Sequence, residues 1–339
     1  MTNRQAFCNR FLDTAGWAAA TRTPLAGDAS NRRYERLSLD TRRAVLMDAP
    51  PDSGEDVRPF AHIGRYLAAQ GLSAPRIMAE DAIHGFLLLE DLGDALFSRV
   101  VADDPALEFP LYAAATDVLV HLHAVDPPSD LPAYSPALMT RMSTMAWQWY
   151  AAGANHPDTE AEVGFSTQFQ PMLEQGATDA SVLIQRDYHA ENLLWLPDRD
   201  GVARVGLLDF QDALLGHPAY DLVSVLQDAR RDVPPDIERA MIARYCAASG
   251  HKRDVFDHAY HLLGAQRNLR ILGVFARLCM TAGKAGYIDL IPRVWGLLER
   301  DLAHPALAPV RALVAESLPP PTPNTLQRLK SRCAIAPTP

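Results

Sequence analysis

Lysine is nearly absent from this chain of 339 residues. Only Lys252, Lys284 and Lys330 occur among its 32 basic residues, so no lysine precedes position 252. A mechanism that needs a lysine in the first two thirds of the chain, in a phosphate-binding loop or as a Schiff base, is therefore excluded. Codon usage in a GC-rich genome is the simplest explanation of this scarcity. An anionic ligand would have to be held by arginines or by a metal ion.

Cysteine and long apolar runs are also scarce. The four cysteines form no CxxC pair and have no histidine at zinc-finger spacing, which argues against a disulfide framework or a structural zinc site; they are Cys8, Cys246, Cys279 and Cys333. No apolar run approaches the ~20 residues of a membrane-spanning helix, and residues 1–16 lack the apolar core of a secretion signal. The net charge of −9 argues against a nucleic-acid partner. We expect a cytoplasmic protein that binds neither membranes nor nucleic acid.

What is present is typical of a globular protein with one large domain or two ordinary ones, since 48% of residues are hydrophobic and 22% are charged. The first hundred residues carry strand and turn signals around one helix. We expect an antiparallel pair, a helix that begins at a capped Ser53–Asp56 segment and ends near Gln70, and two further strands. The predicted strands are Arg33–Leu39, Arg43–Asp48, Arg76–Glu80 and Phe86–Glu90.

From about residue 105 the pattern becomes helical. Apolar faces recur over residues 111–124, 165–173, 220–227, 237–248, 256–281 and 288–302. Strands interrupt it at residues 181–185, 192–196 and 202–208, the last two around a Pro-Asp-Gly turn. Prolines after Ser317 predict an extended or disordered tail. We therefore expect an α+β protein with an N-lobe over 1–92, a helical C-lobe over 93–317 and a Pro-rich tail over 318–339.

Polar residues gather at the predicted hairpin. Asp187 leaves a buried strand, Asn192 begins the next strand, and Asp209 ends the strand paired with it. A hairpin places Asn192 and Asp209 together at its open end, where their oxygens suit Mg²⁺ with waters and phosphates completing the shell. Asp187 could accept a proton from a hydroxyl nucleophile. On the residues alone, turn capping is an equally open interpretation.

Three motifs in order resemble a known family. Asp187-x-x-x-x-Asn192, Leu208-Asp209-Phe210 and the segment 216–222 resemble the catalytic loop and metal-binding segment of the protein-kinase-like superfamily, in its aminoglycoside phosphotransferase and choline kinase branch. The resemblance implies a bilobal α+β fold with a small antiparallel-sheet N-lobe and a larger helical C-lobe. It implies ATP as co-substrate, Mg²⁺ on Asn192 and Asp209, and Asp187 as the catalytic base. Asp221 would brace the catalytic loop.

The N-terminal segments agree with this resemblance. Residues 27–34 look like the branch's phosphate loop, which would give nucleotide contacts to Ser30, Asn31, Arg32 and Arg33. Residues 85–93 resemble the hinge between lobes, with backbone groups near Glu90 and Leu92 placed to bind adenine. An ordinary turn and an ordinary buried strand are the alternatives for these two segments.

Two residues depart from the family pattern. Gln185 stands where the branch usually has His, so an amide would have to make that side chain's hydrogen bond. Met47 stands where kinases place the lysine that holds the α- and β-phosphates. Arg32, Arg33 or Arg36 would have to replace the lysine, and we expect Arg33 first, because it closely follows the predicted loop. Solvated strand arginines are the alternative.

A longer likeness covers roughly residues 10–315. Residues 28–34, 45–51, 220–233 and 266–278 look like those of the anomeric N-acetylmuramate/N-acetylglucosamine kinases of bacterial cell-wall recycling. This implies phosphorylation of the C1 hydroxyl of an amino sugar by a protein that we expect to be a monomer. Candidate substrate residues are His189, Glu191, Gln211, Asp212 and, for the lactyl carboxylate of muramic acid, Arg270. Alternatives are a kinase of aminoglycosides, choline or another small alcohol, and a catalytically inactive nucleotide-binding protein.

Overall fold

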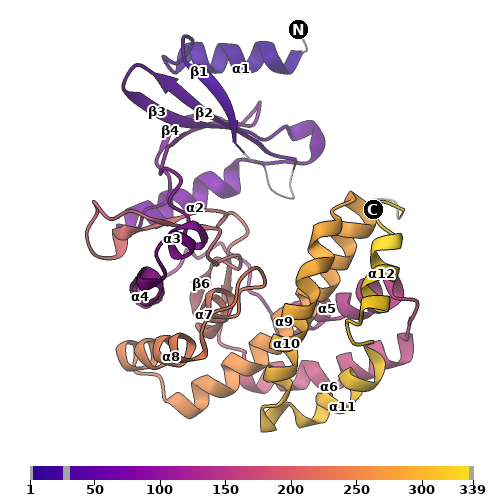
Figure 1. Ribbon diagram of the computed structural model, residues 1–339. Helices are drawn as coiled ribbons and strands as arrows, with labels where there is room; N and C mark the ends of the chain where they lie inside the picture. Colours follow the sequence, from indigo (N-terminus) through magenta and orange to yellow (C-terminus); the bar gives the residue numbers. More distant parts are fainter. Residues whose placement is uncertain (1–2, 26–30, 336–339) are drawn as a thin grey trace. The chain divides into compact units, whose positions relative to one another are not determined.

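The computed structural model describes residues 3–25 and 31–335. Its contacts divide the chain into two compact units, which can be followed along the sequence colours of Figure 1. Unit 1 comprises residues 1–118 and 190–213, and unit 2 comprises residues 119–189 and 214–339. This division does not coincide with the lobe boundaries expected at residues 92 and 317, because a segment from the second half of the chain belongs to unit 1.

Unit 1 is built on an antiparallel sheet with strand order β1-β2-β3-β5-β4. The strands are β1 Thr21–Leu25, β2 Arg33–Leu39, β3 Arg42–Asp48, β4 Ile77–Asp81 and β5 Phe86–Glu90. The predicted antiparallel pair is confirmed as β2 and β3. Strand β1 was not predicted, because its sequence TRTPL is polar and contains Pro24, a residue that sheets accept at an edge.

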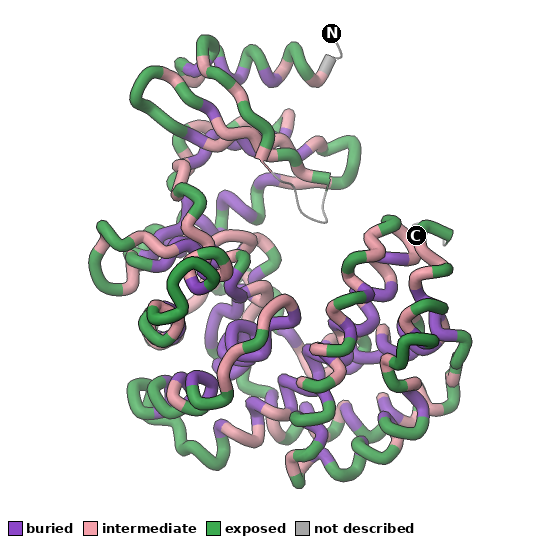
Figure 2. The backbone as a smooth tube through the Cα atoms, in the orientation of Figure 1, coloured by how far each residue is buried: buried purple, intermediate pink, exposed green. Residues whose placement is uncertain are grey.

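Helix α1, Asn3–Thr14, packs against one face of this sheet. Its Cys8, Phe11 and Leu12 share a hydrophobic core with sheet residues, namely Leu37, Ala44, Leu46, Phe86 and Leu88. Buried residues recur along α1 between exposed ones, as expected for a helix that covers a sheet on one side (Figure 2). Because side chains alternate along a strand, the residues between these core positions point to the opposite face.

Helix α2, Arg58–Ala69, buries one face through Phe60, Ala61, Ile63, Gly64 and Leu67. It ends before Gln70 as predicted, and Gly71 follows with a φ of 77°. The predicted capped start was wrong: Val57 precedes the helix without a side-chain cap, and a short 3₁₀ helix, η1 Pro51–Ser53, lies before it. The chain continues through α3 Phe97–Asp103, η2 Pro105–Leu107 and α4 Glu108–Leu122.

The hairpin of β7 Leu193–Trp195 and β8 Val205–Leu207 completes unit 1. The Trp195 N–H donates to the Ala95 carbonyl at 2.8 Å, and the Leu207 N–H donates to the Ser73 carbonyl at 3.0 Å. β8 is shorter than the predicted strand, because residues 201–204 form a 3₁₀ turn, η4. The hairpin is thus tied by backbone hydrogen bonds to segments more than 95 residues earlier in the chain.

Unit 2 is mostly helical. The predicted helical segments of the chain lie in helices, except for a few residues at their ends and for the start of the segment 288–302, which belongs to a 3₁₀ helix. The elements are α5 Pro136–Ser143, the π-helix η3 Ala146–Ala151, α6 Thr159–Gly176, β6 Val182–Ile184, β9 Leu214–Gly216, α7 Ala219–Leu226, α8 Pro235–Ser249, α9 Arg253–Ala282, η5 Ala285–Leu290, α10 Ile291–Leu302, η6 Pro305–Leu307, α11 Ala308–Ser317 and α12 Pro323–Ser331. Within the described ranges, no helix is long and apolar enough to cross a membrane.

Helix α12 contradicts the expected extended or disordered tail. The Thr322 hydroxyl accepts the Thr325 N–H at 3.2 Å, and Pro323 occupies the first turn, where its missing N–H costs nothing. Leu329 is fully buried, and the Tyr150 hydroxyl donates to the Pro319 carbonyl at 2.6 Å. The prolines therefore start a packed helix instead of preventing one.

Candidate active site

Asn192 and Asp209 lie at the open end of the β7–β8 hairpin in unit 1, where Asn192 is opposite Leu208, the residue before Asp209. Leu193 pairs with Leu207, and the Leu208 N–H donates to the Asn192 carbonyl at 2.9 Å. Asp209 follows with a φ of 57°, a left-handed conformation that turns the chain out of β8. The Gln211 amide donates to Asp209 Oδ1 at 2.6 Å, which fixes the carboxylate. Two predicted site residues thus lie at this end of the hairpin, and a third, Gln211, orients one of them.

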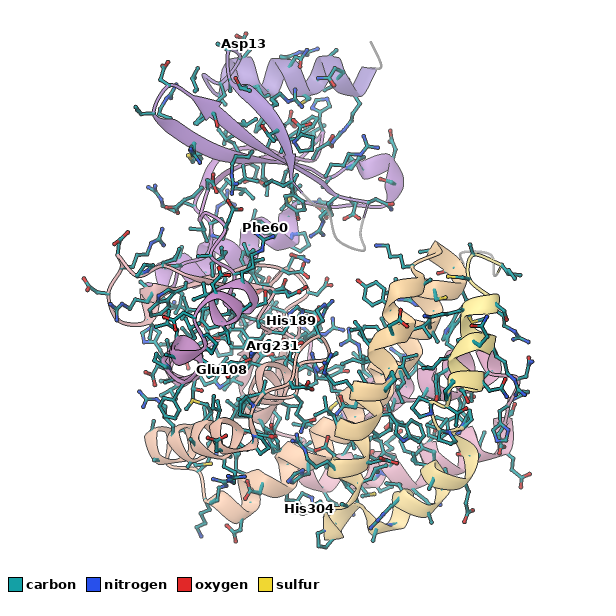
Figure 3. The ribbon with its side chains drawn as sticks, in the orientation of Figure 1. Asp13, Phe60, Glu108, His189, Arg231 and His304 are labelled. Atoms are coloured by element: carbon teal, nitrogen blue, oxygen red, sulfur yellow. The ribbon has the colours of Figure 1, made fainter. Side chains whose placement is uncertain are left out.

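Phe210 anchors this end of the hairpin to α2. Its ring stacks on Phe60 with centroids 4.7 Å apart, and Figure 3 labels Phe60 on its helix. A Cβ atom placed on Gly64 would lie 3.3 Å from the Phe210 ring, so the glycine allows the close approach. Because Phe210 is fully buried, the neighbouring Asp209 is held at a defined position relative to α2.

The donor set at the hairpin end fits a magnesium ion that is shared with phosphates. Asn192 and Asp209 offer an amide oxygen and a carboxylate, which are hard donors. Residues 3–25 and 31–335 contain no group of three or more His, Cys, Asp or Glu placed to hold a metal. Mg²⁺ commonly binds through one or two protein oxygens and completes its shell with water and substrate phosphates. These residues therefore suit Mg²⁺ carried with a nucleotide better than a closed metal site.

The face of the sheet opposite α1 carries the residues nearest to Asp209. Tyr34 on β2 pairs with Met47 on β3, so both side chains lie on this face. Burial raises the pKa of Tyr34 to about 12; the positive charge of Arg32 opposes this increase, and the negative charge of Asp209 adds to it. Arg32, Tyr34 and Asp209 are therefore close neighbours within unit 1.

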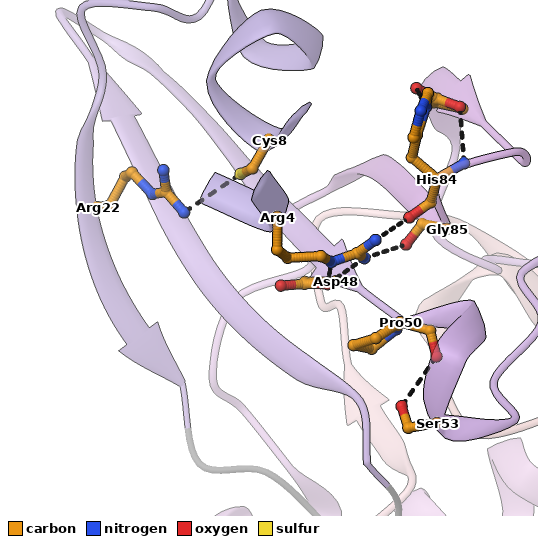
Figure 4. Close-up of polar contacts among 9 residues, drawn as sticks. Arg4, Cys8, Arg22, Asp48, Pro50, Ser53, His84 and Gly85 are labelled. Atoms are coloured by element: carbon orange, nitrogen blue, oxygen red, sulfur yellow. Dashed lines mark hydrogen bonds and ion pairs between the residues drawn. The ribbon is translucent and has the colours of Figure 1, made fainter. Parts of the chain in front are cut away.

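Arg33 lies on the other face of β2. It pairs with Asp48, and Asp48 forms an ion pair with Arg4 of α1, as Figure 4 shows. The Arg33 side chain is exposed on the side that α1 covers, away from Met47. Strand register thus favours Arg32 over Arg33 as the replacement for the absent lysine. The alternation around the apolar Leu37 could have indicated this from the sequence.

Glu55 holds the segment that carries Arg32. One carboxylate oxygen accepts from Arg32 Nε at 2.8 Å, and the other accepts the Asn31 N–H at 3.0 Å. The Asn31 side chain donates to the Ser53 carbonyl at 3.3 Å. Ser30 and the rest of the predicted phosphate loop, residues 27–29, lie outside the described residues. Sequence reasoning missed Glu55, which the spacing of 23 residues does not reveal.

Arginine side chains form ion pairs with the acidic residues of the expected hinge. Arg36 binds Asp91 and Asp94, each through a contact of 2.7 Å. The Glu90 carboxylate accepts from Arg199 Nη2 at 2.9 Å, which connects the hinge to the hairpin turn. The side chain of Glu90 is thus occupied by ion pairs, and any role of Glu90 and Leu92 in binding adenine falls to their backbone groups.

Asp187 follows β6 in unit 2 on a loop that Asp221 braces. The buried Asp221 carboxylate accepts the Gln185 N–H at 2.6 Å and the Arg186 N–H at 2.9 Å. The Ser224 hydroxyl donates to the Arg186 carbonyl at 3.2 Å, and Arg186 has a φ of 72°. The first turns of α7 therefore hold the loop in a left-handed turn just before Asp187, in agreement with the predicted bracing role of Asp221.

Arginines surround Asp187. Burial alone would raise its pKa, but the positive charges of Arg270, Arg267 and Arg186 lower it. The result is a carboxylate that is ionised at neutral pH. Arg270 lies on α9 beside the hydroxyls of Tyr220 and Tyr134. An ionised carboxylate held in this way can accept a hydrogen bond from a substrate hydroxyl.

His189 and Gln185 are buried near this loop. Arg230 Nη1 lies 3.2 Å from His189 Nε2, and burial, reinforced by the charge of Arg230, lowers the pKa of His189 to about 4. His189 is therefore neutral at pH 7. The Gln185 amide nitrogen has no hydrogen-bond partner in the described part of the chain. The hydrogen bond expected of this amide is therefore not made by its nitrogen.

Comparison with known proteins adds the family. The model of the phosphotransferase enzyme family matches residues 21–258. The chain belongs to the phosphotransferase enzyme family. The matched range contains Asp187, Asn192, Asp209 and the bracing Asp221, and it covers most of unit 1. The predicted resemblance is thereby confirmed.

Two relatives of this phosphotransferase match it over nearly their whole length. A protein of Caulobacter vibrioides, named N-acetylmuramate/N-acetylglucosamine kinase, is 39% identical, with 92% of this chain and 96% of the relative covered. A protein of the same name from Pseudomonas aeruginosa is 35% identical, with 90% and 91% covered. The structure of a choline kinase from Streptococcus pneumoniae has a TM-score of 0.61 at 12% identity, with 88% of this chain and 100% of that chain covered. The predicted kinase-like α+β fold is thus confirmed.

The phosphotransferase distributes its predicted site residues between the two units. Unit 1 holds Asn31, Arg32, Arg33, Glu90, Leu92, Glu191, Asn192, Asp209, Gln211 and Asp212, and unit 2 holds Asp187, His189 and Arg270. Arg270 is close to Asp187, and Gln211 is bonded to Asp209. Glu191 and Asp212 are exposed. Each unit therefore holds one set of neighbouring side chains: Arg32 and the oxygen donors near Asp209 in unit 1, and a carboxylate among arginines in unit 2.

Proposed function

We propose that this phosphotransferase transfers the γ-phosphoryl group of ATP to the anomeric C1 hydroxyl of N-acetylmuramate and N-acetylglucosamine. The two relatives that carry this name match more than nine tenths of their own length, which supports the same acceptors here. The observation that carries the reaction class is the ionised Asp187 among arginines, on a loop that leads directly to Asn192.

In the proposed step, Asp187 accepts the proton of the C1 hydroxyl. The C1 oxygen forms a bond to the γ-phosphorus, and the bond between that phosphorus and the β–γ bridging oxygen breaks. The products are the sugar 1-phosphate and ADP. Orientation of the hydroxyl and neutralisation of phosphate charge supply most of the rate in such transfers. The two backbone hydrogen bonds of Asp221 position the loop that carries Asp187.

Phosphate contacts are assigned to unit 1. Asn192 and Asp209 would hold Mg²⁺, and Gln211 would keep the Asp209 carboxylate oriented. When bound, Mg²⁺ would neutralise charge on the transferred group. Arg32 would contact the phosphates in place of the absent lysine, because it shares a sheet face with Tyr34 and Met47 and lies near Asp209. Asn31 would lie beside it on the same Glu55-bound segment.

The use of ATP as phosphoryl donor indicates the compartment in which the reaction takes place. We place the enzyme in the cytoplasm, where ATP is supplied, as a monomer that serves the recycling of cell-wall amino sugars. A catalytically inactive nucleotide-binding protein would not need an ionised Asp187 together with the Asn192 and Asp209 pair. An aminoglycoside kinase would need an acidic acceptor region, whereas Arg267 and Arg270 lie beside Asp187.

An acceptor screen tests this proposal. The purified full chain is given Mg-ATP with N-acetylmuramate, N-acetylglucosamine, choline or kanamycin, and ADP release is measured. We expect turnover with the two amino sugars only. In the ³¹P NMR spectrum of the product, phosphorus should couple to the anomeric proton. Absence of turnover with both amino sugars would refute the proposal, and turnover with choline or kanamycin would identify the alternative acceptor.

A further inference from the structure

Unit 2 concentrates positive charge beside Asp187. Arg186, Arg267 and Arg270 all lie close enough to lower the pKa of Asp187. Arg267 is only 3% exposed, and burial lowers its own pKa as well. An arginine cannot lose its proton to escape such a site, so the buried charge has to be compensated by its surroundings.

The charge of Asp187 supplies part of that compensation for both Arg267 and Arg270. Arg267 donates from Nη1 to the Gln227 carbonyl at 3.3 Å, and its Nε has no hydrogen-bond partner among the described residues. The Asp221 carboxylate is committed to two backbone N–H groups, and burial raises its pKa to about 7.

Asp228 and two tyrosines also lie near these arginines. Asp228, which also faces Arg267, accepts the Arg230 N–H at 2.8 Å. Arg270 faces the side chains of Tyr134 and Tyr220, and burial raises the pKa of the Tyr134 hydroxyl above its ordinary value. Three arginines thus share the carboxylate of Asp187, and the buried Arg267 keeps an Nε donor without a hydrogen-bond partner in the described part of the chain.

We propose that Arg270, with Arg267 behind it, binds a carboxylate of the sugar acceptor. This inference rests on the proposed function and specifies how the two acceptors are distinguished. N-acetylmuramate carries a lactyl carboxylate, whereas N-acetylglucosamine has a hydroxyl at that position. A guanidinium offers a planar pair of donors that matches a carboxylate, and partial exposure leaves Arg270 reachable from solvent. Arg270 is thus a specificity residue for the anionic substrate.

The test compares the variant Arg270→Gln with the wild type on three acceptors: N-acetylmuramate, its neutral methyl ester and N-acetylglucosamine. We expect the KM for N-acetylmuramate to rise about tenfold or more, the loss typical of one charge-assisted hydrogen bond. The KM values for the ester and for N-acetylglucosamine should change less than about twofold, since neither has the charge. The wild type should prefer the acid over the ester, and the variant should not.

Two further variants keep this test informative. Arg253→Gln removes an exposed arginine at the start of the same helix, where it pairs with Asp257 at 2.7 Å, and should leave all three acceptors unaffected. Arg270→Lys retains the charge without the planar fork, so its KM for N-acetylmuramate should lie between those of the wild type and Arg270→Gln. If Arg270→Gln loses its helical circular dichroism, this lysine variant carries the comparison.

The possible outcomes separate the inference from the proposed function. An equal loss of kcat/KM on all three acceptors would show that Arg270 acts through the charge of Asp187 or on the phosphoryl group, and it would overturn the carboxylate site. If the wild type phosphorylates neither sugar, the proposed function fails, and the inference is then judged by binding alone. In that case N-acetylmuramate should raise the Tm of the wild type more than its methyl ester does, and an equal Tm shift would overturn the site.

Discussion

At the scale of single residues, Asp187 carries the chemistry of the proposed reaction. Replacement by asparagine keeps the shape and removes the proton acceptor. We expect Asp187→Asn to lower kcat by about 10²–10⁴-fold, the usual contribution of a positioned base. The Kd for Mg-ATP, measured by calorimetry, should stay within about twofold, because the proposed nucleotide contacts lie in unit 1. Near-normal turnover of the variant would show that Asp187 is not the base.

A matched control for this variant lies just upstream. Asp179 accepts the Ser181 N–H at 2.9 Å before β6, and it is exposed. Asp179→Asn should leave kcat unchanged, so a loss confined to Asp187→Asn cannot come from a general effect of removing an acid near β6.

Arg32 and Arg33 form a second matched pair, since they are neighbours on opposite faces of β2. We expect Arg32→Gln to raise the KM for ATP about tenfold, because one charge-assisted contact to phosphate is lost. Arg33→Gln should change it less than about twofold. Steady-state kinetics at saturating acceptor measure both values. The reverse order would restore Arg33 to the role that its position in the sequence predicts.

Asp221 makes the stability of the fold depend on pH. Burial raises its pKa from the ordinary value of 3.8 to about 7, so the folded protein holds this proton over a range in which the unfolded chain has lost it. The protonated carboxyl therefore stabilises the fold fully below pH 4, and this contribution is lost as pH rises towards 7. The difference in free energy of unfolding between wild type and Asp221→Asn, measured by urea denaturation, should fall from pH 4 to pH 7. A constant difference would mean that Asp221 is already ionised at pH 4.

Sequence reasoning reaches some of these residues better than others. The placement of Asn192 and Asp209 at one end of the hairpin was predictable, because a hairpin brings its two open ends together whatever packs around it. Arg33 was preferred over Arg32 because it closely follows the predicted loop. Proximity to a loop, however, does not tell on which face of a strand a side chain lies. The register that pairs Tyr34 with Met47 supplies that information.

At the scale of elements, Gly85 illustrates how a turn is joined to the sheet. Its φ is 71°, and a Cβ atom there would lie 2.0 Å from the Ala49 carbonyl oxygen. Gly54 has a similar φ of 82° with no atom within 4 Å of the added Cβ. Gly54→Ala should lower the free energy of unfolding by about 1 kcal/mol through backbone strain alone. Gly85→Ala should cost at least about 2 kcal/mol more, because the clash involves backbone that cannot rotate away.

Urea denaturation of both variants gives this comparison directly. The close approach also matters for the backbone, since the Ala49 N–H donates to the Gly85 carbonyl at 2.9 Å. Equal losses for the two variants would show that the β4–β5 turn can move away from Ala49 without cost.

The helices and strands that were predicted are those with a clear hydrophobic periodicity and with turn residues at their ends. Helix α2 and strands β2 and β3 meet this condition. Helix α1 was missed because it is polar apart from a narrow core stripe, and β9 because a strand of three residues has too little pattern to detect. Helix α12 was missed because proline was treated as a breaker, although at the first turn it favours a helix.

At the scale of the whole molecule, the division into units was beyond reach of the sequence. Contacts that place residues 190–213 with the N-terminal sheet are tertiary, such as the bridge between Leu96 and Leu194. The local hydrophobic periodicity of the sequence gives no information on these tertiary contacts. The family resemblance was nevertheless readable, because it depends on the order of motifs along the chain and needs no knowledge of where the units divide.

The hairpin's membership of unit 1 has an energetic consequence. If β7 and β8 belong to the same cooperative unit as the sheet, they should open together with it. The variant Leu37→Ala creates a cavity at a fully buried sheet position and should lower the stability of unit 1 by about 2–4 kcal/mol. Native-state hydrogen exchange of the full chain then reports which amides follow the sheet.

We expect the amides of Trp195 and Leu207 to exchange faster in Leu37→Ala by the same factor as those of β3 and β5. The Leu215 amide of unit 2, which donates to the Pro132 carbonyl at 3.0 Å, should keep its protection. The hairpin is separated from Leu37 by more than 150 residues, so only tertiary packing can transmit the change. If the Trp195 and Leu207 amides instead keep their protection along with Leu215, the hairpin opens with unit 2, and the cooperative units of the molecule follow chain order and not its contacts.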